Sequence, residues 1–551
     1  MSPVPQPPAI RSRYRRTSLM IPGALTAGAL ALTACGPADT SSGSGEGENS
    51  YTIAIPQDMQ GVDRATYSSE ASKVIGDIMH SRLLEVQTSE PGQECAVDVP
   101  PVIKDDSPLV EEWSVTEDGT GIDFTLRDDV LSAAGNTLTS ADVEWSIERI
   151  KAVDASAQTL WFSVGGFDPE DTITVHSPTE FTLHLTEPNG LAPYALSGNA
   201  GLILDSETVQ EHSTDEDPWA TEYLTDHTAD FGPWTLSEFG SQQLTFEPNP
   251  HYSGDRGNLD QVVVRTVSDP SSRIQMLQTG VVSEAIGLDF TQMEALRDAE
   301  GVNVGECPNP ARDWLGLNTK DPILGDTKVR QAISLALDRE AIETGVYRGF
   351  AAPAVGGLAQ AYGADMDDTN YRQDLDRARE LLAEAGHEDG FSFELSISNA
   401  QPGPYAEALA VLIQQQLKEV DIDVKITNVP SATQYRSDGL DHKMQAFLMA
   451  ETPAFGNAGY SAWLTAGCDG LQNYMAYCNE DLDALTETLI DGTAGDREQD
   501  LLDEIADLIA EEQPAIYLVD RPNYNLRHEC AEHVPSSGFG HDMTEAETDC
   551  G

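Results

Sequence analysis

The chain has 551 residues, 40% of them hydrophobic, so it is long enough to bury the cores of roughly two or three domains. Its 93 acidic residues outnumber its 31 Lys and Arg residues and give a formal net charge of −62. This balance excludes a nucleic-acid-binding surface, which needs clustered Lys and Arg. The acidic residues are spread along the chain, which favours a solvated surface suited to high salt over a site that attracts cationic ligands.

The N-terminus has the pattern of an export signal. Four arginines between Arg11 and Arg16 precede an uncharged apolar run over residues 19–34. This run is too short, and too rich in Gly and Ala, to form a stable membrane span. We therefore predict a signal peptide over residues 1–34.

The residues after this run predict how the exported chain is held. Small residues lead into Cys35, and the stretch resembles a bacterial lipobox, in which the cysteine carries the lipid and becomes the first residue after cleavage. Residues 35–50 are rich in Gly, Ser and acids and are typical of a flexible tether. We expect an extracytoplasmic lipoprotein anchored to the outer face of the cell membrane. An ordinary signal peptide with a chance cysteine is the alternative, and Arg15-Arg16 leaves twin-arginine export open beside ordinary secretion.

Strand and helix patterns alternate through the rest of the chain. Residues 122–126 alternate apolar and polar side chains, as a half-buried strand does, and residues 172–185 read as a hairpin around a Ser-Pro turn. Thr139 and Asp142 form a capping box at the start of a helix, and Asp326 caps another. Apolar stripes at helical spacing predict further helices at residues 375–385, 406–417 and 501–509. Strand patterns follow the last two of these helices, at residues 421–426 and 514–519. The mixture predicts an α/β or α+β fold with several sheets.

The cysteines fit an oxidising compartment. Apart from Cys35 the chain has six: Cys95, Cys307, Cys468, Cys478, Cys530 and Cys550. An even number predicts three disulfides, although six cysteines allow 15 connectivities and the sequence alone does not choose among them. We favour the two pairs that are close in sequence, Cys468–Cys478 and Cys530–Cys550, which leaves Cys95–Cys307. The sequence contains no CxxC pair, which argues against a zinc cluster, and we predict no metal site and no cofactor.

Five segments in one order resemble a known family. They are similar to the extracytoplasmic solute-binding proteins of the peptide/nickel class (family 5), the soluble receptors of ABC importers. The likeness extends from about Tyr51 to about Tyr524, and no single motif decides it. The segments are 107–150, 231–265, 316–342, 371–390 and 412–426.

The resemblance implies a bilobed, periplasmic-binding-protein-like α/β fold with an extra subdomain. Two crossovers between the lobes, near Cys307 and near Gln513, would form a hinge, and the ligand would be enclosed when the lobes close. The expected boundaries are lobe I at 51–68, 229–306 and 513–551, its subdomain at 69–228, and lobe II at 307–512. The implied partners are an oligopeptide or another small solute and the permease subunits of an ABC transporter, and the implied state is a monomer.

The ligand site is the weakest part of the resemblance. Peptide-binding relatives capture the peptide amino terminus with an acidic residue in an Asp-Tyr-x-x-Pro-like motif, which is absent from residues 446–464. Glu451 is the one carboxylate there and is our candidate replacement, with a solvated loop acid as the alternative. Phe455, Tyr460 and Trp463 are aromatic candidates to stack on ligand, with core packing as the alternative. The resemblance also implies a cleft-facing acid at Glu70, and Trp161 and Phe162 are candidates to roof the cleft.

Catalytic motifs are missing from the sequence. It has no Gly-Lys pair for a Walker A loop and no G-x-S-x-G elbow. His528 and His533 imitate a zinc-protease motif, but they are five residues apart rather than four and so do not share a helical face. We expect a receptor that delivers oligopeptides and performs no reaction. The alternatives are the same fold with a nickel chelate, an oligosaccharide or another small solute as cargo, and a secreted, salt-adapted hydrolase.

Overall fold

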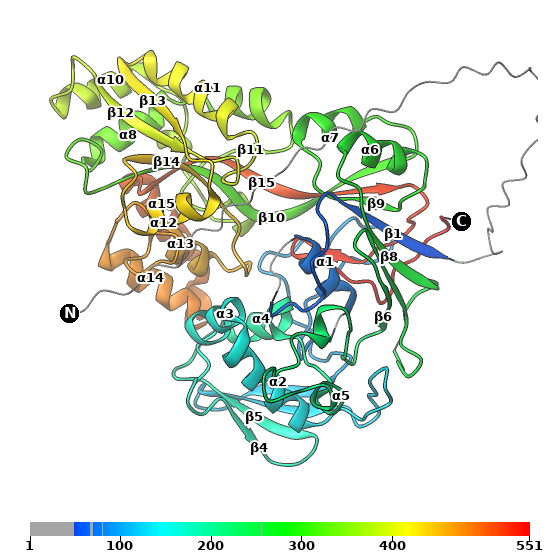
Figure 1. The fold of residues 1–551 in the computed structure, drawn as a ribbon. Coiled ribbons are helices and arrows are strands. Elements are labelled where there is room, and N and C mark those ends of the chain that lie inside the picture. Colours follow the sequence, from blue (N-terminus) through cyan, green and yellow to red (C-terminus); the bar gives the residue numbers. More distant parts are fainter. Residues whose placement is uncertain (1–48, 67–69, 80, 255, 551) are drawn as a thin grey trace, which may run out of the picture. The chain divides into compact units, whose positions relative to one another are not determined.

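The computed structural model describes residues 49–550 except 67–69, 80 and 255. The predicted signal peptide, Cys35 and nearly all of the tether lie outside the described residues. A mixed 11-stranded sheet dominates the fold, in the order β13-β12-β14-β10-β15-β9-β1-β8-β7-β6, with β11 (Ala352–Pro353) paired to β15 (Figure 1). Within the described part of the chain, no helix combines the length and apolar character that a membrane crossing requires.

Lobe I contains one end of this sheet. In β1, the alternate residues Tyr51, Ile53 and Ile55 are buried, and the strand runs parallel to β8 and β9. Helix α1 packs beside this core. The elements of lobe I are β1 (Ser50–Ile55), α1 (Glu70–Met79), β6 (Trp234–Phe239), β7 (Gln243–Pro248), β8 (Gln261–Thr266), α6 (Pro270–Gln278), β9 (Glu284–Ala285) and α7 (Phe290–Leu296).

Lobe II contains the other end of the sheet, covered by helices. Asp326 caps α8 by accepting the N–H of Lys328, as expected, and Asp374 caps α10 in the same way. The elements are α8 (Thr327–Ala336), α9 (Arg339–Ile342), α10 (Leu375–Glu384), β12 (Phe391–Ile397), α11 (Ala406–Lys418), β13 (Ile422–Asn428), α12 (Ala432–Leu440), β14 (Ala446–Glu451), α13 (Ala458–Ala466), α14 (Glu480–Ile490) and α15 (Glu498–Glu512).

Two long antiparallel strands connect the lobes. They are β10 (Val302–Leu317) and β15 (Ala515–His528), and their register breaks between Cys307 and Ala311. The first residues of β15 belong to the lobe II core and Leu526 to a core of lobe I.

The subdomain has a sheet and a core of its own. Its strand order is β2-β3-β5-β4, and the predicted hairpin is β4–β5. Asp142 accepts hydrogen bonds from Thr139 N–H and Oγ1, which forms the predicted start of α2. The elements are β2 (Val110–Val115), β3 (Gly121–Leu126), α2 (Ser140–Val153), α3 (Ala155–Gln158), β4 (Ile173–Val175), β5 (Glu180–His184), α4 (Ala192–Ser197) and α5 (Ser206–Glu211).

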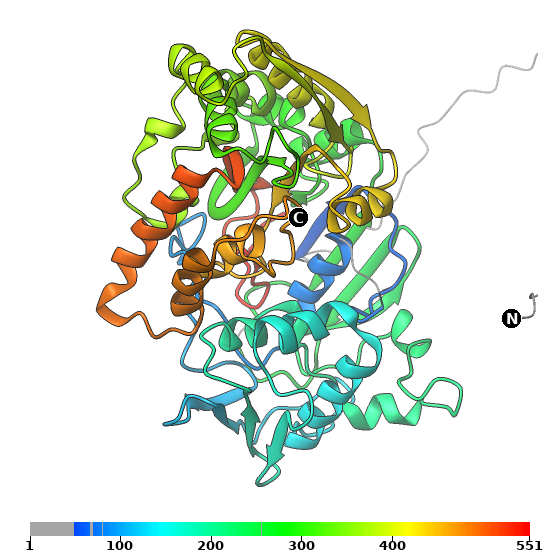
Figure 2. The same cartoon turned by 90° about the vertical axis from the view of Figure 1, so that its left-hand side faces the viewer.

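The subdomain also meets lobe II. Phe455, Tyr460 and Leu464 of lobe II belong to the same buried cluster as the subdomain core. The N–H of Gly190 donates a 2.8 Å hydrogen bond to the carbonyl of Ile490, at the end of α14. Figures 1 and 2 show the cyan subdomain helices beside the orange helices of lobe II.

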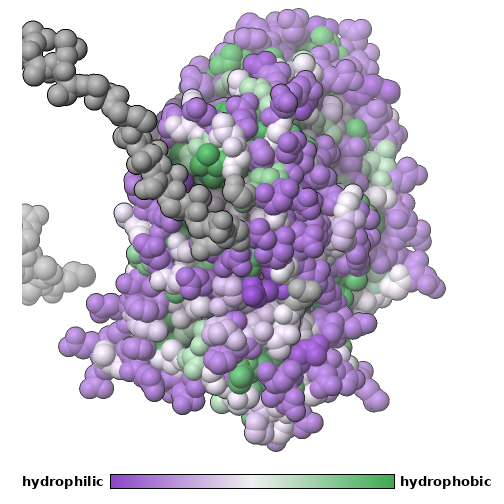
Figure 3. Space-filling model, turned by 90° about the vertical axis from the view of Figure 1, so that its right-hand side faces the viewer, coloured by the Kyte–Doolittle hydropathy of each residue, from purple (hydrophilic) through white to green (hydrophobic). Residues whose placement is uncertain are grey.

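Three disulfides close the chain on itself: Cys95–Cys307, Cys468–Cys478 and Cys530–Cys550, the pairs favoured from the sequence. The last one encloses a C-terminal tail that contains the short hairpin β16 (Ser536–Ser537) and β17 (Gly540–His541). The face of the molecule in Figure 3 is mostly hydrophilic, as the acidic composition predicts.

Candidate functional site: a cavity between the lobes

A cavity of about 470 Å³ lies where lobe I, the subdomain, lobe II and the C-terminal tail meet. Its walls come from the segment between β1 and residue 88, from α4, from the loop 452–456 after β14, and from residues 537–542 of the tail. The two connecting strands contribute Asn309, Arg521 and Asn523. The cavity thus touches every part of the fold and both interlobe connections, which is where a closing hinge can control access.

Arg521 is held rigidly at the hinge. Its Nε donates a 2.7 Å hydrogen bond to Asp313, which is fully buried. The hydroxyls of Tyr347 and Tyr405 donate to the other oxygen of Asp313, each at 2.7 Å. A carboxylate with three donors is fully used, so it fixes the guanidinium that lines the cavity.

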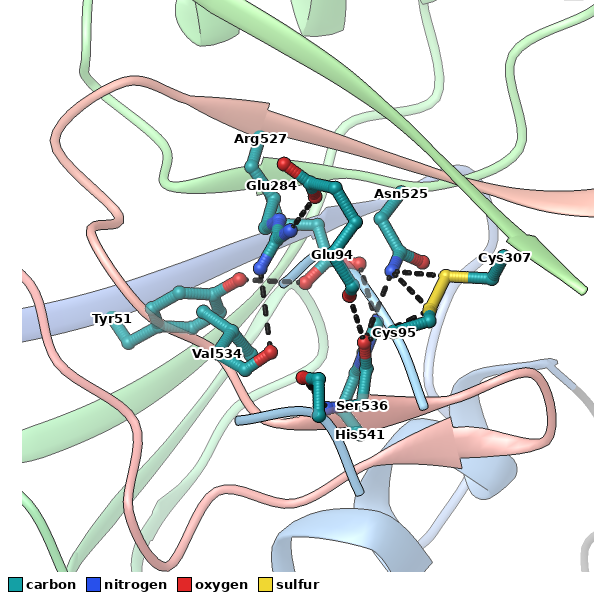
Figure 4. Close-up of polar contacts among 11 residues, drawn as sticks. Tyr51, Glu94, Cys95, Glu284, Cys307, Asn525, Arg527, Val534, Ser536 and His541 are labelled. Carbon is teal, nitrogen blue, oxygen red and sulfur yellow. Dashed lines mark hydrogen bonds and ion pairs between the residues drawn. A yellow bond between two sulfur atoms is a disulfide. The ribbon is translucent and has the colours of Figure 1, made fainter. Parts of the chain in front are cut away.

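The tail is bound to lobe I by a buried ionic contact. His541 Nε2 lies 3.0 Å from Glu284, and the Tyr51 hydroxyl donates to Glu284 at 2.8 Å (Figure 4). Burial alone would raise the pKa of the Glu284 carboxyl, but His541, Tyr51 and Arg527 together lower it. Burial likewise disfavours the His541 imidazolium, yet the Glu284 charge raises the pKa of His541 above its ordinary value.

The Cys95–Cys307 disulfide lies beside this contact. Asn525 Nδ2 donates to Cys307 Sγ at 3.1 Å, and Arg527 pairs with Glu94 (Figure 4). Ser536 Oγ donates to the carbonyl of Glu94 at 2.7 Å. The disulfide, the second connecting strand and the tail therefore form one packed unit behind the cavity.

Of the seven residues expected at the ligand site, Phe455 lines the cavity, and its ring lies 6.4 Å from that of Tyr194 in the subdomain. Tyr460 and Trp463 line a separate cavity of about 290 Å³ between lobe II and the subdomain. Trp161 is fully buried in the subdomain core, with its indole N–H bonded to the carbonyl of Ala200. Phe162 packs against the same core, outside the cavity wall.

The two expected acids have different outcomes. Glu451 is 1% exposed and accepts a hydrogen bond from Ser461 Oγ, and it does not belong to the cavity lining. Glu70 begins α1, but its side chain lies outside the described residues. The carboxylates that do line the cavity are Asp77, Glu85 and Asp542. They come from separate segments with no shared motif, so no sequence signal brings them together.

Two buried carboxyl groups make stability depend on pH. Burial raises the pKa of both Asp230 and Glu451 to about 7. The folded protein then keeps protons that the unfolded chain releases between about pH 4 and pH 7, so their contribution to stability falls as pH rises through this window. We expect D230N/E451Q to gain stability relative to wild type between pH 5 and pH 8, measured by urea unfolding. Parallel pH profiles of the two proteins would contradict this.

Solved structures identify the fold. The Helicobacter pylori periplasmic binding protein DppA, in complex with peptide STSA, aligns with a TM-score of 0.73 and 19% identity over 91% of this chain and 99% of that one. HbpA2 from Haemophilus parasuis aligns with a TM-score of 0.77 and 18% identity over 91% and 100%. The fold is therefore the bilobed fold of periplasmic binding proteins with a subdomain, as expected.

The family follows from the sequence. Residues 107–473 match the model "Bacterial extracellular solute-binding proteins, family 5 Middle", and the chain belongs to this family. The probable D,D-dipeptide-binding periplasmic protein DdpA of Escherichia coli is 26% identical over 393 residues, 69% of this chain and 72% of the relative. The glutathione-binding protein GsiB of Salmonella paratyphi A is 24% identical over 425 residues, 75% and 80%.

Membership of this family settles the class of activity. Its members are extracytoplasmic binding proteins rather than enzymes, and they capture a substrate for an ABC transporter. The hydrolase alternative is therefore not supported, and the cavity between the lobes is the candidate binding site.

Proposed function

We propose that this protein captures oligopeptides in the cavity between its lobes and delivers them to the permease of an ABC importer. The carrying observation is the cavity itself, which is lined by both charged and apolar side chains, lies at both connecting strands and receives residues from every part of the fold. A structural relative is described in complex with the peptide STSA, and a sequence relative is named for D,D-dipeptides. Of the expected site residues, Phe455 is proposed to contact the cargo.

The anchor, the boundaries and the oligomeric state belong to the same proposal. Cys35 carries the lipid, residues 1–34 are removed, and residues 35–50 let a monomer reach the permease. The lobes and subdomain have the boundaries given above, with two changes. Helix α1 belongs to lobe I because Val74, Ile75 and Ile78 pack in its core. The second crossover moves towards Arg521 because Ile516, Leu518 and Val519 pack in the lobe II core. Labelling with a radioactive fatty acid tests the anchor, and Cys35→Ser is expected to abolish the label.

The cargo is tested by mass spectrometry of small molecules released from the denatured protein after native purification. Peptides are expected. Recovery of a nickel chelate or an oligosaccharide instead would show that the cargo is that solute and not an oligopeptide. If the purified protein releases no small molecule, a randomised tripeptide library is titrated against it. The absence of any bound tripeptide would then contradict the proposal.

Closure of the lobes brings lobe II into contact with the subdomain. A Cβ on Gly190 would lie 2.8 Å from the carbonyl oxygen of Ile490, closer than real contacts allow. We expect Gly190→Ala to weaken cargo binding about 3- to 10-fold, because it disturbs one interlobe hydrogen bond that exists in the closed arrangement. Calorimetric titration with the purified cargo measures this.

The matched control for this variant is Gly345→Ala, in lobe II. Its added Cβ would meet only Leu412 at 3.6 Å, an ordinary contact. This variant should bind like wild type. Equal affinities of both variants and the wild type would show that the contact between Gly190 and Ile490 does not report on closure.

A further inference from the structure

Arg64 is a cationic side chain at the cavity that has no ion-pair partner among the described residues. It lies in the turn region after β1 and lines the interlobe cavity and a smaller neighbouring one. Its Nε is buried without a hydrogen bond, and its guanidinium makes no ion pair with any described residue. A buried guanidinium normally finds an acceptor, so an unsatisfied one at a cavity wall points to an acceptor that comes from outside the chain.

The carboxylates nearest to Arg64 are already used. Both oxygens of Asp63 accept from Arg149, at 3.1 and 2.7 Å. Asp154 accepts the N–H groups of Ser156 and Ala157, at 3.0 and 2.8 Å. Neither carboxylate forms an ion pair with Arg64, and Asp154 uses its Oδ1 for both of these hydrogen bonds.

Other cations of the cavity are matched within the protein. Arg82 donates to Asp77 at 2.9 Å, and Lys104, next to the cavity wall, lies 3.3 Å from Glu85, which lines it. Arg521 is held through its Nε by Asp313, as described above. Among the described arginines of this cavity wall, Arg64 is thus the one without a carboxylate partner.

The balance of charge at the cavity also differs from that of the whole chain. Acidic residues outnumber basic ones by 93 to 31 overall. The cavity wall instead has Arg64, Lys73, Arg82 and Arg521 against Asp77, Glu85 and Asp542. A chain with so few cations has gathered four of them at one cavity, which lowers the cost of placing an anion there.

We infer that Arg64 binds a carboxylate of the cargo, so that the transported solute is an acid rather than a neutral or purely cationic compound. This rests on the proposed function, because it names the chemistry that the same cavity selects. A guanidinium presents parallel N–H donors that match the two oxygens of a carboxylate, and partial burial strengthens such a pair. The free carboxyl terminus of a peptide supplies the required group, as do small organic acids.

The test compares acids with their neutral counterparts. A randomised tripeptide library is titrated as free acids and as C-terminal amides, together with succinate, glutamate and citrate, and the bound fraction is measured by native mass spectrometry. The proteins are wild type, Arg64→Gln, Arg64→Lys and the surface control Arg372→Gln, whose side chain is largely exposed. Thermal unfolding without ligand checks that each variant folds.

We expect wild type and Arg372→Gln to bind the free acids about tenfold or more tightly than the amides. Arg64→Gln should lose this preference while its melting temperature stays near that of wild type, and Arg64→Lys should keep part of it.

Equal binding of acids and amides by wild type, or an unchanged preference in Arg64→Gln, would overturn the inference and leave the peptide-binding function intact. Binding of organic acids alone, dependent on Arg64, would support the inference and overturn the peptide proposal. No binding of any probe would overturn both.

Discussion

Removal of the Cys95–Cys307 disulfide by a double substitution with alanine is expected to lower the free energy of unfolding by about 5 kcal/mol. The two cysteines are 212 residues apart, and a cross-link between distant residues restricts the unfolded chain most strongly. The bond also joins the connecting strand β10 to the segment between α1 and β2, within the packed unit of Figure 4. We therefore expect weaker cargo binding as well. Urea unfolding under non-reducing conditions measures the loss.

The other two disulfides are the matched controls. Cys530–Cys550 and Cys468–Cys478 close loops of 20 and 10 residues, and their removal should cost about 3 kcal/mol each. The cost should therefore follow sequence separation, with the Cys95–Cys307 variant clearly the least stable. Equal losses in the three variants would show that restriction of the unfolded chain is not the main contribution.

Replacement of Arg312 by alanine is expected to destabilise the protein by about 3–5 kcal/mol. Arg312 is 1% exposed, and its Nε donates to Asp520 at 2.7 Å. Its other nitrogens donate to the carbonyls of Gly356 and Gly357, and the guanidinium lies 3.6 Å from the centre of the Tyr517 ring. Loss of the arginine leaves these acceptors, and above all the buried Asp520 charge, without their partner.

Two variants separate this explanation from a simple loss of packing. Arg312→Met with Asp520→Asn removes both charges and should recover part of the lost stability. Arg372→Ala removes an exposed partner of Asp368 and should cost at most about 1 kcal/mol. If the double variant is no more stable than Arg312→Ala by urea unfolding, the unpaired Asp520 charge is not the cause.

Local features of the fold were predictable because their causes are local. Asp326 and the pair Thr139 and Asp142 cap helices with side chains that lie within one turn of the groups they bind. The hairpin of residues 172–185 follows from alternating apolar residues around a Ser-Pro turn. The bilobed arrangement, in contrast, came from the order of five family-like segments, since no periodicity encodes the position of a hinge.

The ligand site was less predictable because it is assembled from distant segments. Arg64 and Arg521 belong to opposite ends of the chain, and both line the cavity. The aromatic pattern around residues 455–463 predicted ligand contacts, but Phe455 lies in the loop before α13 and reaches the cavity wall, whereas Tyr460 and Trp463 lie on α13 and line a separate cavity. Burial of Trp161 and Glu451 depends on tertiary packing that the sequence does not reveal.

The proposed mechanism requires the two lobes to close on the cargo around β10 and β15. Small-angle X-ray scattering of the protein, first stripped of ligand and then saturated with the cargo identified by mass spectrometry, measures this change. We expect the radius of gyration to fall when cargo is added, and to fall less in Gly190→Ala. An identical scattering profile with and without bound cargo would show a rigid receptor and contradict closure as the means of capture.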